Sequence, residues 1–194
     1  MSKLGELKEI LKKLIAIPSV TGNEHDIAIY IADYLRQCGV DSVELQPVEG
    51  NRLNVVAHLK GEKVGPVVLL TGHMDTVAPG EGWRTDPFKA TERDGRIYGR
   101  GAADMKGGIA AILVAIRNAA AQREQMRGEA IIAFVCDEEA YSKGVDALIR
   151  SGIRADYGIA AEPEWDAVIG AVGKMLIKVR VYGIAAHGSQ PEKG

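Results

Sequence analysis

The sequence predicts an α/β fold in which helices cover a mixed, mostly parallel sheet. Segments with a helical apolar repeat alternate with short runs rich in β-branched residues, as in layered α/β proteins. The run at 65–72, GPVVLLTG, is almost uniformly apolar, which is typical of a strand covered on both faces. The 194-residue chain has 46% hydrophobic and 26% charged residues, enough apolar side chains for a substantial core.

Two amphipathic helices are expected first. Apolar residues recur at helical spacing along the first segment: Leu4, Leu7, Leu11, Leu14 and Ile15. This helix is expected to end before Pro18, because proline disfavours helical geometry at the residue before it. Thr21 and Glu24 have the spacing of a capping box, so a second helix is expected to begin there and to end at Gly39.

Strands and helices then alternate along the chain. We expect strands at 51–61 and 65–72, a helix at 108–121, a strand within 128–140, a short helix at 145–151, a strand at 157–161 and a β-rich run at 167–182. The segment at 78–108 has no strong periodicity and many Gly, Asp and Pro residues. Long loops of this kind inside compact domains are usually functional.

Composition excludes several classes of function. The formal net charge of −2 gives no support to a nucleic-acid partner. No apolar run approaches the roughly 18 to 20 residues that span a bilayer, so no membrane role is expected. The N-terminal segment lacks the uninterrupted apolar core of a secretory signal, which predicts a cytoplasmic protein. Cys38 and Cys136 are too few and too isolated for a disulfide framework or a thiolate metal site.

Three apolar runs end in imidazole or carboxylate groups: VVLLTGHMD, IIAFVCDEE and YGIAAEP. In open α/β sheets, ligands bind outside the carboxyl ends of the strands. If these ends share one edge, they bring together His73, Asp75, Asp137, Glu138, Glu139 and Glu162. So many carboxylates cannot remain ionised in one site unless a cation neutralises them. The sequence therefore predicts a metal site at this edge.

The spacing of these groups suggests different tasks. His73 and Asp75 are two apart on an extended segment and point the same way, so Asp75 can accept one ring proton while the other nitrogen ligates metal. The adjacent Glu138 and Glu139 point to different sides, which suits one ligand and one residue facing water. Asp104 lies in a glycine-rich loop before a helix and could bridge two ions. Histidine and carboxylates without thiolates suit zinc, with manganese or cobalt as substitutes.

Five motifs in order resemble the M20-type zinc metallopeptidase family, which includes acetylornithine deacetylase, succinyl-diaminopimelate desuccinylase, aminoacylase and the glutamate carboxypeptidases. The motifs are GHMDTV, DGRIYGRGAADMKGG, CDEEA, AEP and GIAAHGSQP. The resemblance implies a layered α/β/α catalytic domain at 1–182, with the start of an inserted dimerisation (lid) domain at 183–194. It also implies a truncated chain and a homodimer for the full-length protein.

The resemblance also implies roles for single residues. The implied metal ligands are His73, Asp104, Glu139 and Glu162, with Asp104 bridging the two zinc ions of a complete family site. Glu138 would be the general base, and Asp75 would orient His73. His187 would correspond to a histidine that family dimers supply across their interface to the developing oxyanion of the substrate.

The implied activity is metal-dependent hydrolysis of amide bonds in N-acyl amino acids or small peptides. No residue of the chain occupies the position of the histidine that completes the second zinc site. We therefore expect the chain alone to bind one metal at best in native-like geometry, with weak or no activity. Two alternatives remain. One is a non-catalytic relic that retains the fold and one metal site. The other is a nucleotide-binding domain, disfavoured because Asp104 replaces the third glycine of the fingerprint and would repel a pyrophosphate.

Overall fold

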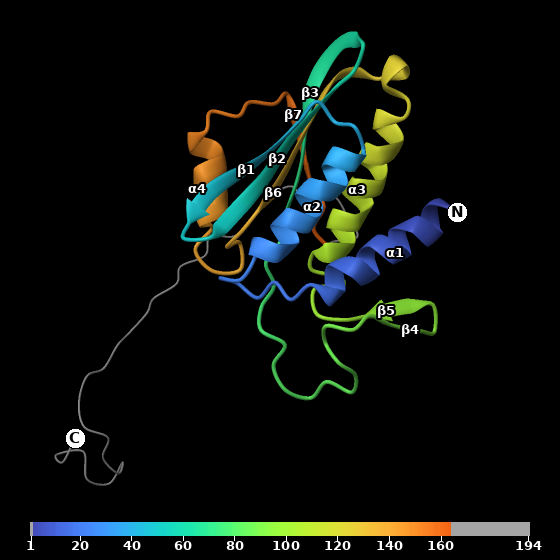
Figure 1. The fold of residues 1–194 in the computed structure, drawn as a ribbon, viewed down its shortest axis with the longest axis vertical. Coiled ribbons are helices and arrows are strands. Elements are labelled where there is room, and N and C mark those ends of the chain that lie inside the picture. The colour runs from blue at the N-terminus through green and yellow to red at the C-terminus, as the bar shows by residue number, and fades with distance from the viewer. Residues whose placement is uncertain (1, 164–194) are drawn as a thin grey trace, which may run out of the picture.

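The computed structural model describes residues 2–163, in which helices and strands alternate as expected (Figure 1). The helices are α1 (Lys3–Ala16), α2 (His25–Gln37), α3 (Lys106–Ala120), the short 3-10 helix η1 (Arg123–Gln125) and α4 (Lys143–Arg150). The strands are β1 (Ser42–Glu49), β2 (Arg52–Lys60), β3 (Lys63–His73), β4 (Thr91–Arg93), β5 (Arg96–Tyr98), β6 (Arg127–Val135) and β7 (Tyr157–Ala160). The β-rich run expected at 167–182, the segment at 183–194 and His187 lie outside the described residues.

The central sheet has five strands in the order β1-β2-β6-β3-β7. The pairs β1·β2 and β2·β6 are antiparallel, whereas β3·β6 and β3·β7 are parallel. Consequently β1, β6, β3 and β7 all point the same way and β2 alone is reversed. The mixed, mostly parallel sheet is thus confirmed, and β3, β6 and β7 end at the same edge.

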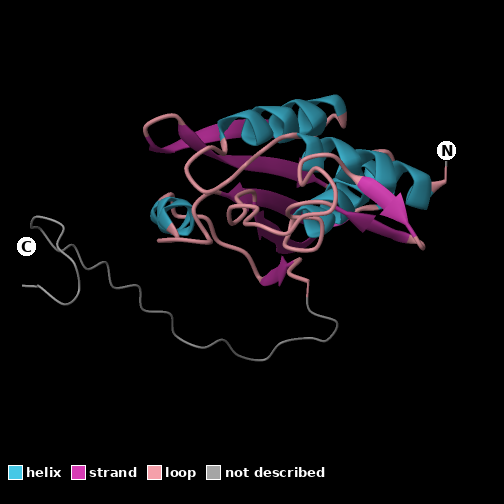
Figure 2. Cartoon of the chain, turned by 90° about the horizontal axis from the view of Figure 1, so that it is seen from below, coloured by secondary structure: helices cyan, strands magenta, loops and turns pink. Residues whose placement is uncertain are grey.

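Helices cover both faces of this sheet (Figure 1; Figure 2). The main core lies between the sheet and α1, α2 and α3, and a smaller cluster lies under α4. Successive residues of β6 belong alternately to the main core and to the cluster under α4. Ala130, Ile132 and Phe134 belong to the main core, and the intervening residues belong to the cluster under α4. This two-sided burial explains the nearly uniform apolar composition of the strand.

The first helix ends at Ala16, before Pro18, as expected. The capping box expected for the second helix is wrong. The N-cap of α2 is Glu24, whose side chain makes no capping hydrogen bond. Thr21 instead donates its hydroxyl hydrogen to Asp75 Oδ2 at 2.9 Å, so a tertiary partner takes the group that a local cap would have used.

The long segment between β3 and α3 contains one element that its sequence did not suggest. Strands β4 and β5 form a small hairpin. Asp94 and Gly95 have φ values of +52° and +71°, the left-handed backbone that a tight hairpin turn requires. The Asp-Gly dipeptide between TER and RIY was the available signal. No helix among residues 2–163 is long and apolar enough to cross a bilayer.

A buried lysine joins α3 to the end of α1. Lys106, the first residue of α3, is fully buried, and its Nζ donates to the carbonyl oxygens of Leu14 at 2.9 Å and Ile17 at 2.8 Å. Burial lowers the pKa of Lys106 to about 8. These contacts fix the start of α3 and thereby the loop that contains Asp104.

This lysine makes stability depend on pH. An unfolded lysine has a pKa of about 10.4, so the unfolded chain binds more protons than the folded chain between about pH 8 and pH 10.4, and the free energy of unfolding rises with pH. Between pH 7.5 and pH 9.5, the free energy of unfolding of the parent should rise by about 2 kcal/mol more than that of Lys106→Met. Urea denaturation of both proteins at the two pH values measures this difference. Equal pH dependence in the two proteins would contradict the buried, titrating lysine.

Candidate metal centre

Three segments that are distant in sequence meet at His73. This residue ends β3 and is 2% exposed. Its Nε2 lies 2.9 Å from Asp104 Oδ1, in the loop before α3, and 3.8 Å from Glu162 Oε2, just after β7. Strand β7 pairs in parallel with β3, which explains why residues after the two strands lie together.

Glu139 completes the group from the end of β6. One ligand atom from each of His73, Asp104 and Glu139 lies within 4.8 Å of the other two. Zinc bonds of about 2.0–2.2 Å in a tetrahedral site place the ligand atoms of one ion roughly 3.3 Å apart, so atoms within 4.8 Å of one another are close enough to ligate one ion or two neighbouring ions. The geometry therefore brings together the four residues that the sequence suggested as ligands, His73, Asp104, Glu139 and Glu162.

Electrostatics favour a cation at this position. Burial raises the pKa of Glu139, and the neighbouring charge of Asp104 raises it further. Burial lowers the pKa of His73, but the carboxylates of Asp75 and Glu162 outweigh this effect, so its pKa is raised overall. Carboxylates that repel one another around a single imidazole are stabilised when a divalent cation binds among them.

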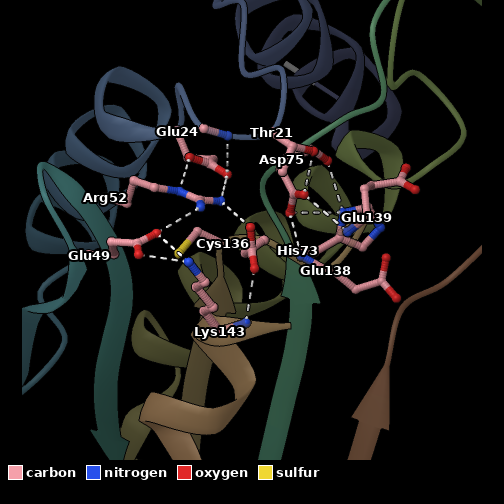
Figure 3. A network of polar contacts seen from close by, with 12 residues as sticks. Thr21, Glu24, Glu49, Arg52, His73, Asp75, Cys136, Glu138, Glu139 and Lys143 are labelled. Atoms are coloured by element: carbon pink, nitrogen blue, oxygen red, sulfur yellow. Dashed lines mark hydrogen bonds and ion pairs between the residues drawn. The ribbon is translucent and has the colours of Figure 1, made fainter. Parts of the chain in front are cut away.

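Asp75 holds the turn that contains the two glutamates (Figure 3). Its fully buried carboxylate accepts hydrogen bonds from the main-chain N–H of Glu138 at 3.0 Å, the N–H of Glu139 at 3.1 Å and the hydroxyl of Thr21 at 2.9 Å. Each oxygen therefore accepts from one glutamate N–H group. The carboxylate links the end of β3 to the end of β6.

The contact between Asp75 and His73 differs from the sequence expectation in its atoms. His73 Nδ1 lies 2.9 Å from the main-chain oxygen of Asp75 and 3.7 Å from its Oδ1. The main chain of residue 75 thus provides the nearer acceptor for the ring, because the carboxylate is directed to the donors of the glutamate turn. His73 Nε2 remains directed at the carboxylate cluster.

A second buried network supports the same turn, and sequence patterns gave little sign of it. Arg52 donates from Nε to Glu24 at 2.8 Å (Figure 3), and its terminal NH2 group lies 2.8 Å from Asp137 Oδ1. Asp137 has a φ of +70° and also accepts from the N–H groups of Tyr141 at 3.2 Å and Lys143 at 3.1 Å. Asp137 therefore fixes the backbone next to Glu138.

Removing one acceptor from the glutamate turn should harm both stability and metal binding. In Asp75→Asn, one of the two oxygens becomes an amide nitrogen, which cannot accept from a buried main-chain N–H. We expect a loss of about 1–3 kcal/mol in the free energy of unfolding and a 10- to 100-fold weaker zinc affinity. Denaturation and calorimetric zinc titration measure the two effects. The exposed Asp33→Asn is the matched control, and equal behaviour of the two variants would contradict the role of Asp75.

Comparison with known proteins agrees with this site. A model of peptidase family M20/M25/M40 matches residues 69–184, more than half of the chain. The chain is 36% identical over 194 residues to a succinyl-diaminopimelate desuccinylase of Stenotrophomonas maltophilia (strain R551-3), covering 93% of the chain and 51% of that protein. The desuccinylase of Nautilia profundicola (strain ATCC BAA-1463 / DSM 18972 / AmH) is 34% identical over 196 residues, with 95% and 51% covered.

Solved structures show the same relationship. The M20 family metallo-carboxypeptidase Sso-CP2 of Sulfolobus solfataricus superimposes with a TM-score of 0.71 at 25% identity, over 80% of this chain and 37% of that one. The chain spans about half the length of the curated relatives it matches. The family match includes the strand ends that contain His73, Glu139 and Glu162. The chain therefore belongs to peptidase family M20/M25/M40, whose members are hydrolases.

Proposed function

We propose that this chain is part of a metal-dependent hydrolase that cleaves amide bonds in N-acyl amino acids or small peptides. The observation that supports this most is the cluster of His73, Asp104 and Glu139, which lie at the end of β3, in the loop before α3 and in the turn after β6, with ligand atoms within 4.8 Å of one another. The names of the similar proteins, desuccinylases and a carboxypeptidase, support the same class of reaction.

The donor set of the site fits zinc. One imidazole nitrogen faces carboxylate oxygens, and neither cysteine belongs to the cluster. We propose that His73, Asp104 and Glu162 hold one zinc ion, and that Asp104 and Glu139 contribute to a second; cobalt or manganese would accept the same ligands. When bound, the metal would polarise the scissile carbonyl and lower the pKa of the attacking water.

The placement of Glu138 supports a role as the general base. Its main-chain N–H is held by Asp75, and it lies next to Glu139, yet it is outside the group of ligand atoms. Figure 3 shows the side chains of Glu138 and Glu139 projecting in different directions. We propose that the Glu138 carboxylate takes a proton from the attacking water and then gives it to the leaving amine nitrogen.

Part of the proposal rests on the family resemblance alone. We propose that 1–182 is the N-terminal part of the catalytic domain and that 183–194 begins the dimerisation domain of a homodimeric protein. In that assembly His187 would contact the developing oxyanion. Residues 183–194, including His187, lie outside the described part of the chain.

The test is metal-dependent release of free amine from N-succinyl amino acids, N-acetyl amino acids and a dipeptide. Both the chain and its extension from the adjoining reading frame are assayed after zinc loading. We expect hydrolysis by the extended protein that chelation removes and zinc restores, with weak or no hydrolysis by the chain alone. Stoichiometric zinc without hydrolysis in either protein would contradict the proposal and support the non-catalytic alternative.

A further inference from the structure

A cavity of about 560 Å³ lies within the segment that joins two of the candidate ligands. Its lining includes the rings of Trp83 and Tyr98, three arginines (Arg84, Arg93 and Arg100) and one glutamate, Glu81. Pro79 is six residues after His73, and Arg100 is four residues before Asp104. Figure 1 shows this segment, in green, beyond the end of the sheet at which β3 ends. Its volume is that of a small-molecule site.

One arginine fixes the wall of the cavity. Arg100 donates from its terminal NH2 group to the carbonyl oxygen of Pro79 at 2.9 Å, and Trp83 Nε1 donates to the same oxygen at 2.7 Å. The guanidinium of Arg100 lies over the Trp83 ring, 5.4 Å from its centroid. The two ends of the segment are thus joined by a stacked, hydrogen-bonded guanidinium whose plane is held in place.

The positive charge of the cavity is incompletely neutralised within residues 2–163. Its lining contains three arginines against one glutamate, although the whole chain has a net charge of −2. Arg100 Nε is buried and has no hydrogen-bond partner, and no carboxylate of the described residues forms an ion pair with Arg84 or Arg100. Arg93 lies over the Tyr98 ring at 5.2 Å, and its ion-pair partner Asp94 is at 3.5 Å on the exposed surface. A bound anion would pair with the exposed guanidinium of Arg84, since the buried Arg100 Nε offers no accessible surface to a ligand.

We propose that this cavity is a binding site for a carboxylate ligand with a short aliphatic body. The arginine forks suit a planar, two-oxygen anion, and the rings of Trp83 and Tyr98 provide apolar surface for the carbon chain. The ligand is either a free small dicarboxylate or the acidic end of a substrate. Only the substrate case rests on the proposed hydrolase function.

Direct binding tests the proposal without any metal or catalysis. The chain is treated with chelator, and Trp165 is replaced by phenylalanine so that Trp83 is the remaining tryptophan of the two. Succinate is titrated at constant ionic strength, with neutral succinamide and inorganic phosphate as comparison ligands. We expect a saturable change in Trp83 fluorescence with succinate, weaker binding of phosphate and no binding of succinamide.

The matched variants are Arg84→Gln and Arg150→Gln. Arg84 makes no ion pair among the described residues, so its loss should leave the fold intact, and Arg150 is an exposed arginine on α4. Arg84→Gln should weaken succinate binding about tenfold, whereas Arg150→Gln should leave it unchanged. Arg93→Gln, verified to be folded by circular dichroism, should weaken it as well. Binding of succinamide equal to that of succinate, tighter binding of phosphate, or unchanged affinity in Arg84→Gln would each overturn the proposal.

A kinetic comparison separates the two sources of the carboxylate. In the hydrolysing protein, Arg84→Gln is compared with the parent on N-succinyl and N-acetyl derivatives of one amino acid. A selective rise in KM for the succinyl derivative assigns the site to the substrate. If Arg84→Gln and the parent have equal KM values for the succinyl derivative, and the parent still binds succinate, the cavity is assigned to a free dicarboxylate. A failure of hydrolysis in every protein would affect the proposed function alone, because the fluorescence titration is independent of it.

Discussion

His73→Ala is expected to weaken zinc binding by the chain at least about 100-fold, beyond the effect that loss of a supporting hydrogen bond produces. His73 provides the one nitrogen in the described cluster, and its Nε2 lies 2.9 Å from Asp104 and 3.8 Å from Glu162. Without the imidazole, a zinc ion loses its nitrogen ligand, and the carboxylates lose the group around which they are arranged. Calorimetric titration of chelator-treated chain with zinc measures the change.

His25→Ala is the matched control. His25 Nδ1 contacts the main-chain oxygen of Asn51 at 3.0 Å, and His25 does not belong to the carboxylate cluster. Its replacement should leave zinc affinity within about twofold of the parent, as expected for a surface substitution. Equal losses in the two variants, or unchanged affinity in His73→Ala, would remove the basis for the metal centre.

Glu138→Gln is expected to lower kcat of the hydrolysing protein by about 10² to 10⁴-fold while zinc stoichiometry stays unchanged. The glutamine keeps the size and the main-chain contact to Asp75 but cannot accept the proton of the attacking water. Steady-state kinetics and metal analysis of the same preparation measure the two quantities.

The neighbouring Glu139→Gln separates a base from a ligand. Glu139 belongs to the cluster of ligand atoms, so its substitution should weaken metal binding as well as hydrolysis. The roles assigned to the two residues would be contradicted if Glu138→Gln lost metal in proportion to its activity, or if it hydrolysed substrate at the parent rate.

Most of the fold could be predicted because its elements have strong local patterns. The apolar run of β6 is buried on both faces, the apolar residues of β3 pack half-buried against both clusters, and Pro18 and Gly39 limit the first two helices. Strand β1 was missed because it is an edge strand whose residues alternate between half-buried and exposed and include Pro47. An edge strand tolerates proline and polar residues, so its local pattern is weak.

For the site, the sequence predicted only the types of ligand residue and the edge of the sheet at which they meet. Parallel strands that end together made the approach of His73, Glu139 and Glu162 foreseeable. The contacts that position them could not be foreseen. Thr21 and Arg52 reach the site from separate elements, through hydrogen bonds that leave no spacing pattern in the sequence. A local sequence pattern predicts the face of an element on which a side chain lies. The residue that the side chain contacts depends on tertiary packing.

X-ray absorption at the zinc edge of the zinc-loaded chain tests the central claim most directly. The described geometry requires a first shell with one imidazole nitrogen at about 2.0–2.1 Å, carboxylate oxygens at about 2.0–2.2 Å and no sulfur near 2.3 Å. In His73→Ala the imidazole contribution should disappear. A sulfur ligand in the parent, or an imidazole contribution that persists in His73→Ala, would contradict a metal centre formed by the strand ends.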